Sequence, residues 1–195
     1  MTRRANRSFA ALAFLLPVAL GAAPLRLEAA RAPFVPPSVF ISPSGEPFRS
    51  PAGAAASFEA WFARVDTNHD GRIDKAEFEA DAMAFFRKLD LSGDGVIDGS
   101  EIGAYEKTIA PELIARSDEG EAGHDAYVSL LNEAEPVSGA DLSLDLRITA
   151  PEWRAAADRR FAALDAAGRG FLDHDALLAR LPRPGKARRP READK

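Results

Sequence analysis

Cysteine is absent from the 195 residues of this chain. Its absence excludes disulfides, thiolate metal sites, cysteine nucleophiles and a lipid anchor on cysteine. Tyrosine and tryptophan are scarce, with two of each against twelve phenylalanines, which suits helices that pack through phenylalanine rather than a surface that stacks on bases. Positive charge is also lacking where a core is expected, since residues 57–181 hold 26 acidic and 13 basic residues. This region repels phosphate backbones and attracts cations, so we expect no nucleic acid partner.

The N-terminus has the layout of a secretory signal. Arg3, Arg4 and Arg7 precede an apolar run over residues 8–23 that ends in small residues. The run is shorter than the roughly 20 residues of a transmembrane helix. The sequence therefore predicts a signal peptide over residues 1–23 and a periplasmic or secreted location. The alternative is an uncleaved anchor, and only then do we expect membrane association.

Helical periodicity begins only in the second quarter of the chain. Residues 24–56 are rich in Pro, Ala and Ser and predict an extended linker, although residues 34–48 are apolar enough to dock on a domain. Ser57 is the expected N-cap of the first helix, and an amphipathic pattern predicts a second helix over residues 75–89. The Pro-rich, basic residues 182–195 predict a disordered tail.

An internal repeat organises the central region. Residues 66–102 align without gaps onto residues 141–177, so that Glu77 corresponds to Glu152 and Phe86 to Phe161. Each copy predicts a unit of loop, helix and loop. We name the four loops by their order: loop one (66–77), loop two (90–101), loop three (141–152) and loop four (165–176).

Loops one and two each carry a complete set of oxygen donors at positions 1, 3, 5, 7 and 12. The predicted metal ligands of loop one are Asp66, Asn68, Asp70, Arg72 and Glu77. Those of loop two are Asp90, Ser92, Asp94, Val96 and Glu101. Arg72 and Val96 would contribute only their backbone carbonyls, and the glutamates would each supply two oxygens. Glycine at position 6 allows the bend around the ion, and this all-oxygen spacing is what Ca²⁺ requires.

Both loops resemble the calcium loops of the EF-hand family. The resemblance covers residues 57–181 and implies an all-α fold of helix-loop-helix repeats with short β pairing between loops, as in small exported proteobacterial EF-hand proteins. It divides the region into an EF-hand pair over residues 57–106, a connecting segment over residues 107–140 and a degenerate pair over residues 141–181. Ile73 and Ile97 are expected to pair loops through short strands.

The two later loops depart from the pattern. Loop three has Leu146 where glycine belongs, and a leucine held at positive φ costs about 1–2 kcal/mol. Its other ligand positions are filled, so weak calcium binding and a metal-free structural loop both remain open. Loop four has Ala167, Arg169 and Ala176 at ligand positions, so we expect it to bind no calcium and to survive as a pairing partner for another loop.

No set of residues arranged for catalysis is apparent in the sequence. His69, His124 and His174 lack a metal-binding companion at i+4 and are expected to be solvated. The first functional hypothesis is a calcium-stabilised or calcium-sensing module that binds another protein through an apolar groove between helices. The second is a passive calcium-loaded protein or buffer. An enzyme is disfavoured, because calcium ligation accounts for the carboxylates and no nucleophile has a base.

Overall fold

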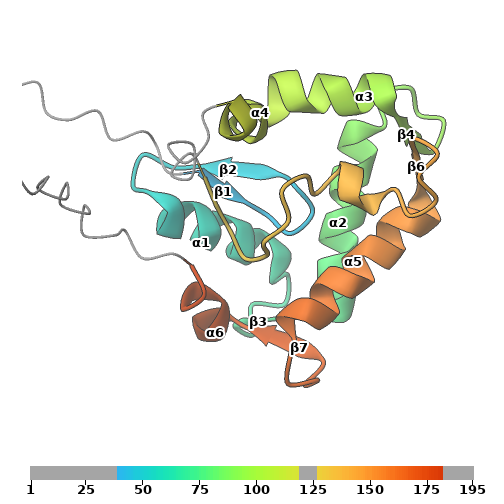
Figure 1. Cartoon of the computed structure of the whole chain (residues 1–195). Helices are drawn as coiled ribbons and strands as arrows, with labels where there is room; N and C mark the ends of the chain where they lie inside the picture. The colour runs from blue at the N-terminus through green and yellow to red at the C-terminus, as the bar shows by residue number, and fades with distance from the viewer. Residues whose placement is uncertain (1–38, 119–126, 182–195) are drawn as a thin grey trace, which may run out of the picture. The chain divides into compact units, whose positions relative to one another are not determined.

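Two long helices lie at the centre of the structure, a computed structural model that describes residues 39–118 and 127–181 (Figure 1). They are α2 (Lys75–Leu89) and α5 (Ala150–Leu164). The predicted signal peptide and basic tail lie outside the described residues.

The apolar stripes of α2 and α5 face each other. The ring of Phe78 lies 5.6 Å from that of Phe161, and Phe86 lies 5.8 Å from Trp153. The buried Trp153 indole N–H donates to the Ala82 carbonyl at 2.8 Å, which satisfies its only polar atom. The two repeats therefore pack on each other through the helix that each carries between its loops.

Each loop contains a three-residue strand at its positions 7 to 9, and the strands pair between repeats. The strands are β3 (Arg72–Asp74), β4 (Val96–Asp98), β6 (Arg147–Thr149) and β7 (Phe171–Asp173). β3 pairs antiparallel with β7, and β4 with β6. Loop one thus pairs with loop four and loop two with loop three, at opposite ends of the central helices (Figure 1).

The first helix, α1 (Ala54–Val65), starts earlier than predicted. Its N-cap is Gly53, and Ser57 is a buried residue inside the helix, so the predicted N-cap is wrong. Residues 54–56 are all alanine, the best helix former, and they extend the helix one turn backwards.

A three-stranded sheet is the main departure from the predicted all-α fold. Its strands are β1 (Val39–Ile41), β2 (Pro47–Arg49) and β5 (Tyr127–Ser129). β1 lies in the middle, antiparallel to β2 and parallel to β5. The prediction of an extended linker over residues 24–56 is therefore wrong for residues 39–56, which form a hairpin and the start of α1.

Strand β1 is part of the hydrophobic core. Its three residues are all buried, and the ring of Phe40 lies 5.6 Å from Phe58 and 5.4 Å from Trp61, both on α1. A continuous run of β-branched and aromatic residues suits a strand covered on both faces. The hairpin and α1 pack together as a second layer beside the central helices.

A helical segment follows loop two and holds the hairpin turn. It comprises α3 (Gly99–Ala104), the π-helical turn η1 (Tyr105–Ile109) and α4 (Pro111–Asp118), with a break at Ala110 because Pro111 cannot continue the preceding turn. The Tyr105 hydroxyl donates to the Gly45 carbonyl at 2.6 Å. Gly45 has φ 97°, and a Cβ there would lie 3.0 Å from that hydroxyl, so the turn requires glycine.

The connecting segment is fixed to α5 by a buried arginine. This segment contains the 3-10 turn η3 (Ser138–Ala140). After α5 and β7, the last helix among the described residues is α6 (His174–Leu178). Arg160, 5% exposed, donates from Nε and Nη2 to Glu133 at 2.8 and 2.6 Å and also to the Pro136 carbonyl.

Candidate metal centre

Loop one is folded around the carboxylate of Asp66. Asp66 is buried, and its two oxygens accept hydrogen bonds from the backbone N–H groups of Asp70 at 3.1 Å and Gly71 at 3.0 Å. Gly71 has φ 77°, the left-handed conformation that the bend requires. The first ligand position of the loop therefore sets the path of the chain.

The last ligand position of loop one caps the helix that follows. Glu77 Oε2 accepts from the Asp74 N–H at 3.1 Å, and the Asp74 side chain accepts from the Glu77 N–H at 2.8 Å, which makes a capping box at the start of α2. Glu77 Oε1 accepts from Thr67 N–H and from its hydroxyl, each at 2.9 Å. Burial raises the pKa of Glu77, but hydrogen bonds from Asp74, Thr67 and Asn68 outweigh it and lower the pKa below its usual value.

Loop two repeats this arrangement. The Asp90 carboxylate accepts from the N–H groups of Gly93, Asp94 and Gly95 at 2.7, 3.1 and 2.9 Å. Glu101, 5% exposed, accepts from the Ser92 N–H at 2.9 Å and forms the capping box of α3 with Asp98. The two loops therefore form the same local hydrogen bonds and the same capping box, as the shared spacing of their ligand residues predicts.

The donor chemistry of both loops fits calcium. Hydrogen bonds to the backbone link the predicted ligand residues of loop one, because Asp70 N–H donates to Asn68 Oδ1 at 2.9 Å and Asn68 N–H donates to Glu77 Oε1 at 3.3 Å. Arg72, at the seventh position, offers its carbonyl at the start of β3. Among the described residues, no three His, Asp or Glu side chains converge closely enough to hold a metal ion, since these carboxylates are turned to backbone N–H groups. The predicted ligands, from Asp66 to Glu77 and from Asp90 to Glu101, therefore remain a prediction. Its support is that oxygen donors occupy the positions of each loop that calcium requires.

Loop three has the same backbone as loop two despite its leucines. Asp141 accepts from the N–H groups of Leu144, Asp145 and Leu146 at 2.7, 3.3 and 2.9 Å, close to the values around Asp90. Leu144 and Leu146 have φ of 60° and 64°, so both occupy the left-handed region. Hydrogen bonds from Thr149 and Ser143 hold the pKa of Glu152 at about 2.

Loop four keeps the turn without the ligands. Asp165 accepts from the N–H groups of Arg169 at 2.9 Å and Gly170 at 2.7 Å. Leu172 pairs with Ile73 across β7 and β3, which confirms that loop four serves as a pairing partner. Ile97 pairs with Ile148 rather than with Ile73. The sequence did not indicate which loops would pair, because the order is set by how α2 packs on α5.

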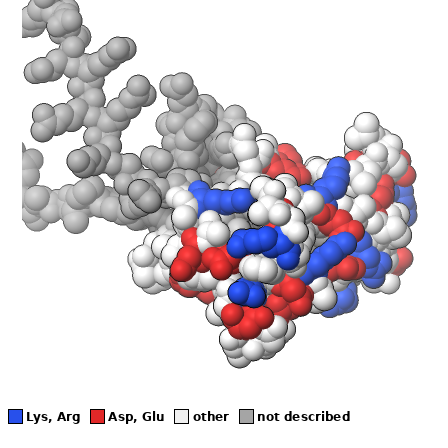
Figure 2. Space-filling view, turned by 90° about the horizontal axis from the view of Figure 1, so that it is seen from below, with Lys and Arg blue, Asp and Glu red and all other residues white. Residues whose placement is uncertain are grey.

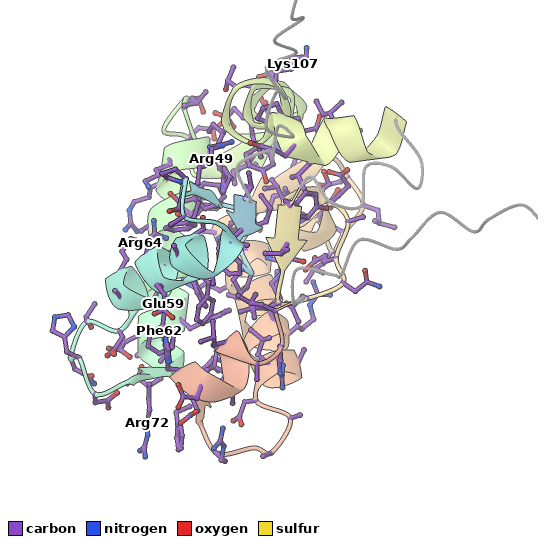
Figure 3. All side chains as sticks on the ribbon, turned by 90° about the vertical axis from the view of Figure 1, so that its left-hand side faces the viewer. Arg49, Glu59, Phe62, Arg64, Arg72 and Lys107 are labelled. Carbon is purple, nitrogen blue, oxygen red and sulfur yellow. The ribbon has the colours of Figure 1, made fainter. Side chains whose placement is uncertain are left out.

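His174 is a correction to the prediction of solvated histidines. Its Nε2 lies 2.8 Å from Glu59 Oε2 and its Nδ1 lies 3.0 Å from Asp175 Oδ1. Its ring centroid lies 4.7 Å from that of Phe62, which α1 brings close to α6 together with Glu59 (Figure 3). Burial lowers the pKa of His174, but hydrogen bonds with Asp175 and Glu59 outweigh it and raise the pKa above its usual value. No local signal could have revealed this contact, since 115 residues separate Glu59 from His174.

The other two histidines and the surface add little to the site. His69 is exposed in loop one, and His124 lies outside the described residues.

On the face that Figure 2 shows, acidic and basic side chains are intermixed. In the part of the chain that is described, no helix has both the length and the apolarity needed to cross a bilayer.

Comparison with known proteins supports the reading of the first two loops. Two adjacent segments, residues 58–83 and 82–104, match the model of the EF hand family. The first segment contains loop one and the second contains loop two. Among curated proteins, none matches the chain.

Proposed function

Because residues 58–104 match the model of the EF hand family, we propose that the chain binds one calcium ion in loop one and one in loop two. The observation that carries this proposal is that both loops combine a full oxygen donor set with the left-handed glycine at position 6. Calcium would take over the interaction that the Asp and Glu side chains of each loop now make with the dipoles of backbone N–H groups.

Calorimetric titration of the demetallated chain with calcium tests this proposal. We expect two strong sites, and Glu77→Ala or Glu101→Ala should each remove its own site by deleting a bidentate ligand. Glu79→Ala is the matched control, because Glu79 lies on α2 two residues beyond Glu77 and contacts Arg154 at the surface. A stoichiometry below two in the unaltered protein would contradict the proposal.

A protein-interaction module or a passive calcium-loaded protein would both use these sites. The apolar stripe of α2 is buried, and its buried residues are Phe78, Ala82, Phe85, Phe86 and Leu89. An interaction module of the sensing kind must open this packing, whereas a buffer barely opens. Binding of a hydrophobic dye with calcium and with chelator separates the two: a calcium-dependent increase supports the module, and an unchanged signal supports the passive role.

We also propose that the chain is exported to the periplasm or secreted. The support is the arginine-rich, apolar N-terminal sequence described above. Cell fractionation with mass spectrometry of the N-terminus tests the location and any cleavage near residue 23. Recovery in the cytoplasm with an intact N-terminus would contradict it.

A further inference from the structure

The large hydrophobic side chains that are exposed in the described residues gather on loops two and three. They are Leu91 at 69%, Leu142 at 43%, Leu144 at 84% and Leu146 at 75% exposure, and we call them the leucine patch. They occupy positions 2, 4 and 6 of their loops. The same positions in loops one and four carry small or polar residues: Thr67, His69, Gly71, Ala166, Gly168 and Gly170. Only one of the two paired loop ends is therefore apolar.

The two loops that carry the leucine patch are fixed to each other. Loops two and three are joined through β4 and β6, where the buried Ile97 pairs with the buried Ile148. Leu144 and Leu146 are in the left-handed region, which disfavours leucine, and both side chains point away from the core. These leucines lie outside the core, so packing within the fold does not account for them.

A second copy of the chain is a poor occupant for this surface. Loops two and three hold seven carboxylates and one basic residue, Arg147; the carboxylates are Asp90, Asp94, Asp98, Glu101, Asp141, Asp145 and Glu152. Two copies face to face would bring these like charges together. A stable protein interface also uses roughly 20–30 residues a side, far more than four leucines on loop tips.

A lipid bilayer fits the patch better. The boundary between headgroups and acyl chains accepts protruding apolar side chains without a matching pocket. The described region is acidic, but residues 182–195 hold six basic and two acidic residues, and this tail is attracted to a bilayer that contains anionic lipid. Calcium in loop two would reduce the negative charge of this end of the molecule, whose carboxylates otherwise keep it away from lipid phosphates.

We propose that the leucine patch docks on a bilayer containing anionic lipid and inserts at the headgroup–acyl boundary when loop two holds calcium. The calcium dependence rests on the calcium binding proposed for loop two, whereas insertion of the leucines rests on their exposure alone.

Fluorescence quenching by lipid tests insertion at the patch itself. Leu91→Trp is introduced into the full chain, which is mixed with vesicles of phosphatidylcholine and phosphatidylglycerol carrying brominated acyl chains. Thr67→Trp is the matched control, at the same position of loop one. The natural Trp61 and Trp153 are 0% and 1% exposed and stay out of reach of the bromine atoms. We expect quenching at residue 91 with calcium, little with chelator, and none at residue 67.

A second variant measures the leucines without adding a tryptophan. Leu144→Asn and Leu146→Asn together keep a residue that tolerates positive φ, so the loop should still fold. We expect vesicle affinity in calcium to fall at least about tenfold, because two apolar side chains no longer enter the lipid. His69→Asn is the control, because residue 69 of loop one also has a positive φ but carries no apolar side chain. It should leave the affinity unchanged.

Each other outcome is decisive. Absence of quenching at residue 91, or equal quenching at residues 91 and 67, overturns the proposal. Loss of self-association or of a soluble protein partner in the double Asn variant, with vesicle affinity unchanged, assigns the patch to a protein and also overturns it. Quenching that persists in chelator overturns the calcium dependence while insertion stands, and calorimetry of loop two then decides the proposed function separately.

Discussion

At the scale of single residues, position 6 of each loop decides the strain in the turn. Gly71, Gly95 and Gly170 have φ between 77° and 83°, while Leu146 adopts 64° at the same position. The sequence predicted that this leucine would be strained, and the structure shows that loop three accepts the strain rather than changing its path. The backbone of loop three is thus formed, and its ligand positions other than the glycine are filled.

Leu146→Gly is expected to strengthen calcium binding by loop three. Glycine removes a conformational cost of about 1–2 kcal/mol, which corresponds to roughly a tenfold gain in affinity to the extent that Leu146 leaves the left-handed region when loop three is free of calcium. Calorimetric titration of the variant and the parent measures it, with Glu152→Ala added to Leu146→Gly as the control that removes the site. Equal affinity in parent and variant would show that the backbone at residue 146 is not the limiting defect.

His174→Gln is expected to change how stability depends on pH. The pKa of His174 is raised in the folded state, so its contribution is fully present below the unfolded pKa of about 6.5 and is lost as pH rises through the higher folded pKa. The unfolding free energy of the parent should therefore exceed that of the variant more at pH 5.5 than at pH 8.5.

Urea unfolding in chelator at these two pH values measures the difference without calcium. Glu59→Gln removes one of the two carboxylates at the imidazole and should give a smaller pH dependence of the same sign. A parent–variant difference that is the same at both pH values would contradict the assigned role of His174.

At the scale of elements, α2 connects the two predicted calcium sites. Its N-terminus is capped by Asp74 and Glu77, and its C-cap is Asp90, the first residue of loop two. The Asp90 carboxylate lies at the negative end of the helix dipole, where a bound cation relieves an unfavourable interaction. The same helix therefore presents a ligand of loop one at its start and a ligand of loop two at its end.

Disabling loop one is expected to weaken loop two through this helix. Glu77→Ala removes both a calcium ligand and half of a capping box, so the order that calcium gives to the start of α2 is lost. Calcium affinity at loop two should fall several-fold, by roughly 1 kcal/mol. Titration of Glu77→Ala against Glu79→Ala measures it, and equal affinity at loop two in both variants would mean that α2 is only a spacer.

The elements that sequence could predict are those set by local spacing. The loops and the bounds of α2 follow from residues within a turn or two of each other. The sheet of β1, β2 and β5 could not be predicted, because Tyr127 joins Val39 in parallel from 88 residues away and neither segment has a long alternating pattern. The pairing of loop one with loop four was hidden for the same reason, since it depends on the packing of α2 against α5.

At the scale of the whole molecule, calcium and the fold are expected to be linked. The loop strands join the two repeats at both ends of the central helices, so ordering loops one and two also orders their partners in loops three and four. Because of this arrangement, we expect calcium to stabilise the whole described region rather than a single loop and its helices.

Calcium is expected to raise the melting temperature of the chain. Binding to native loops alone adds about 2.7 kcal/mol per site when free calcium is 100-fold above the dissociation constant. Thermal unfolding followed by circular dichroism, with calcium and with chelator, measures this increase. The double variant of Glu77→Ala and Glu101→Ala should melt at the same temperature in both conditions, and an unaltered chain that does so would contradict the linkage.

Phe40→Ala is expected to destabilise the whole fold, because the segment that resembles a linker supplies part of the core. Phe40 is 0% exposed between Phe58 and Trp61, and truncating a buried phenylalanine costs about 3–5 kcal/mol. Phe171→Ala, on the half-buried ring of β7, is the control and should cost clearly less. Urea unfolding monitored at the helices measures both. If residues 39–49 were only a linker, Phe40→Ala would leave the unfolding midpoint of the helices unchanged, and the hairpin would then be an appendage that the helical core does not need.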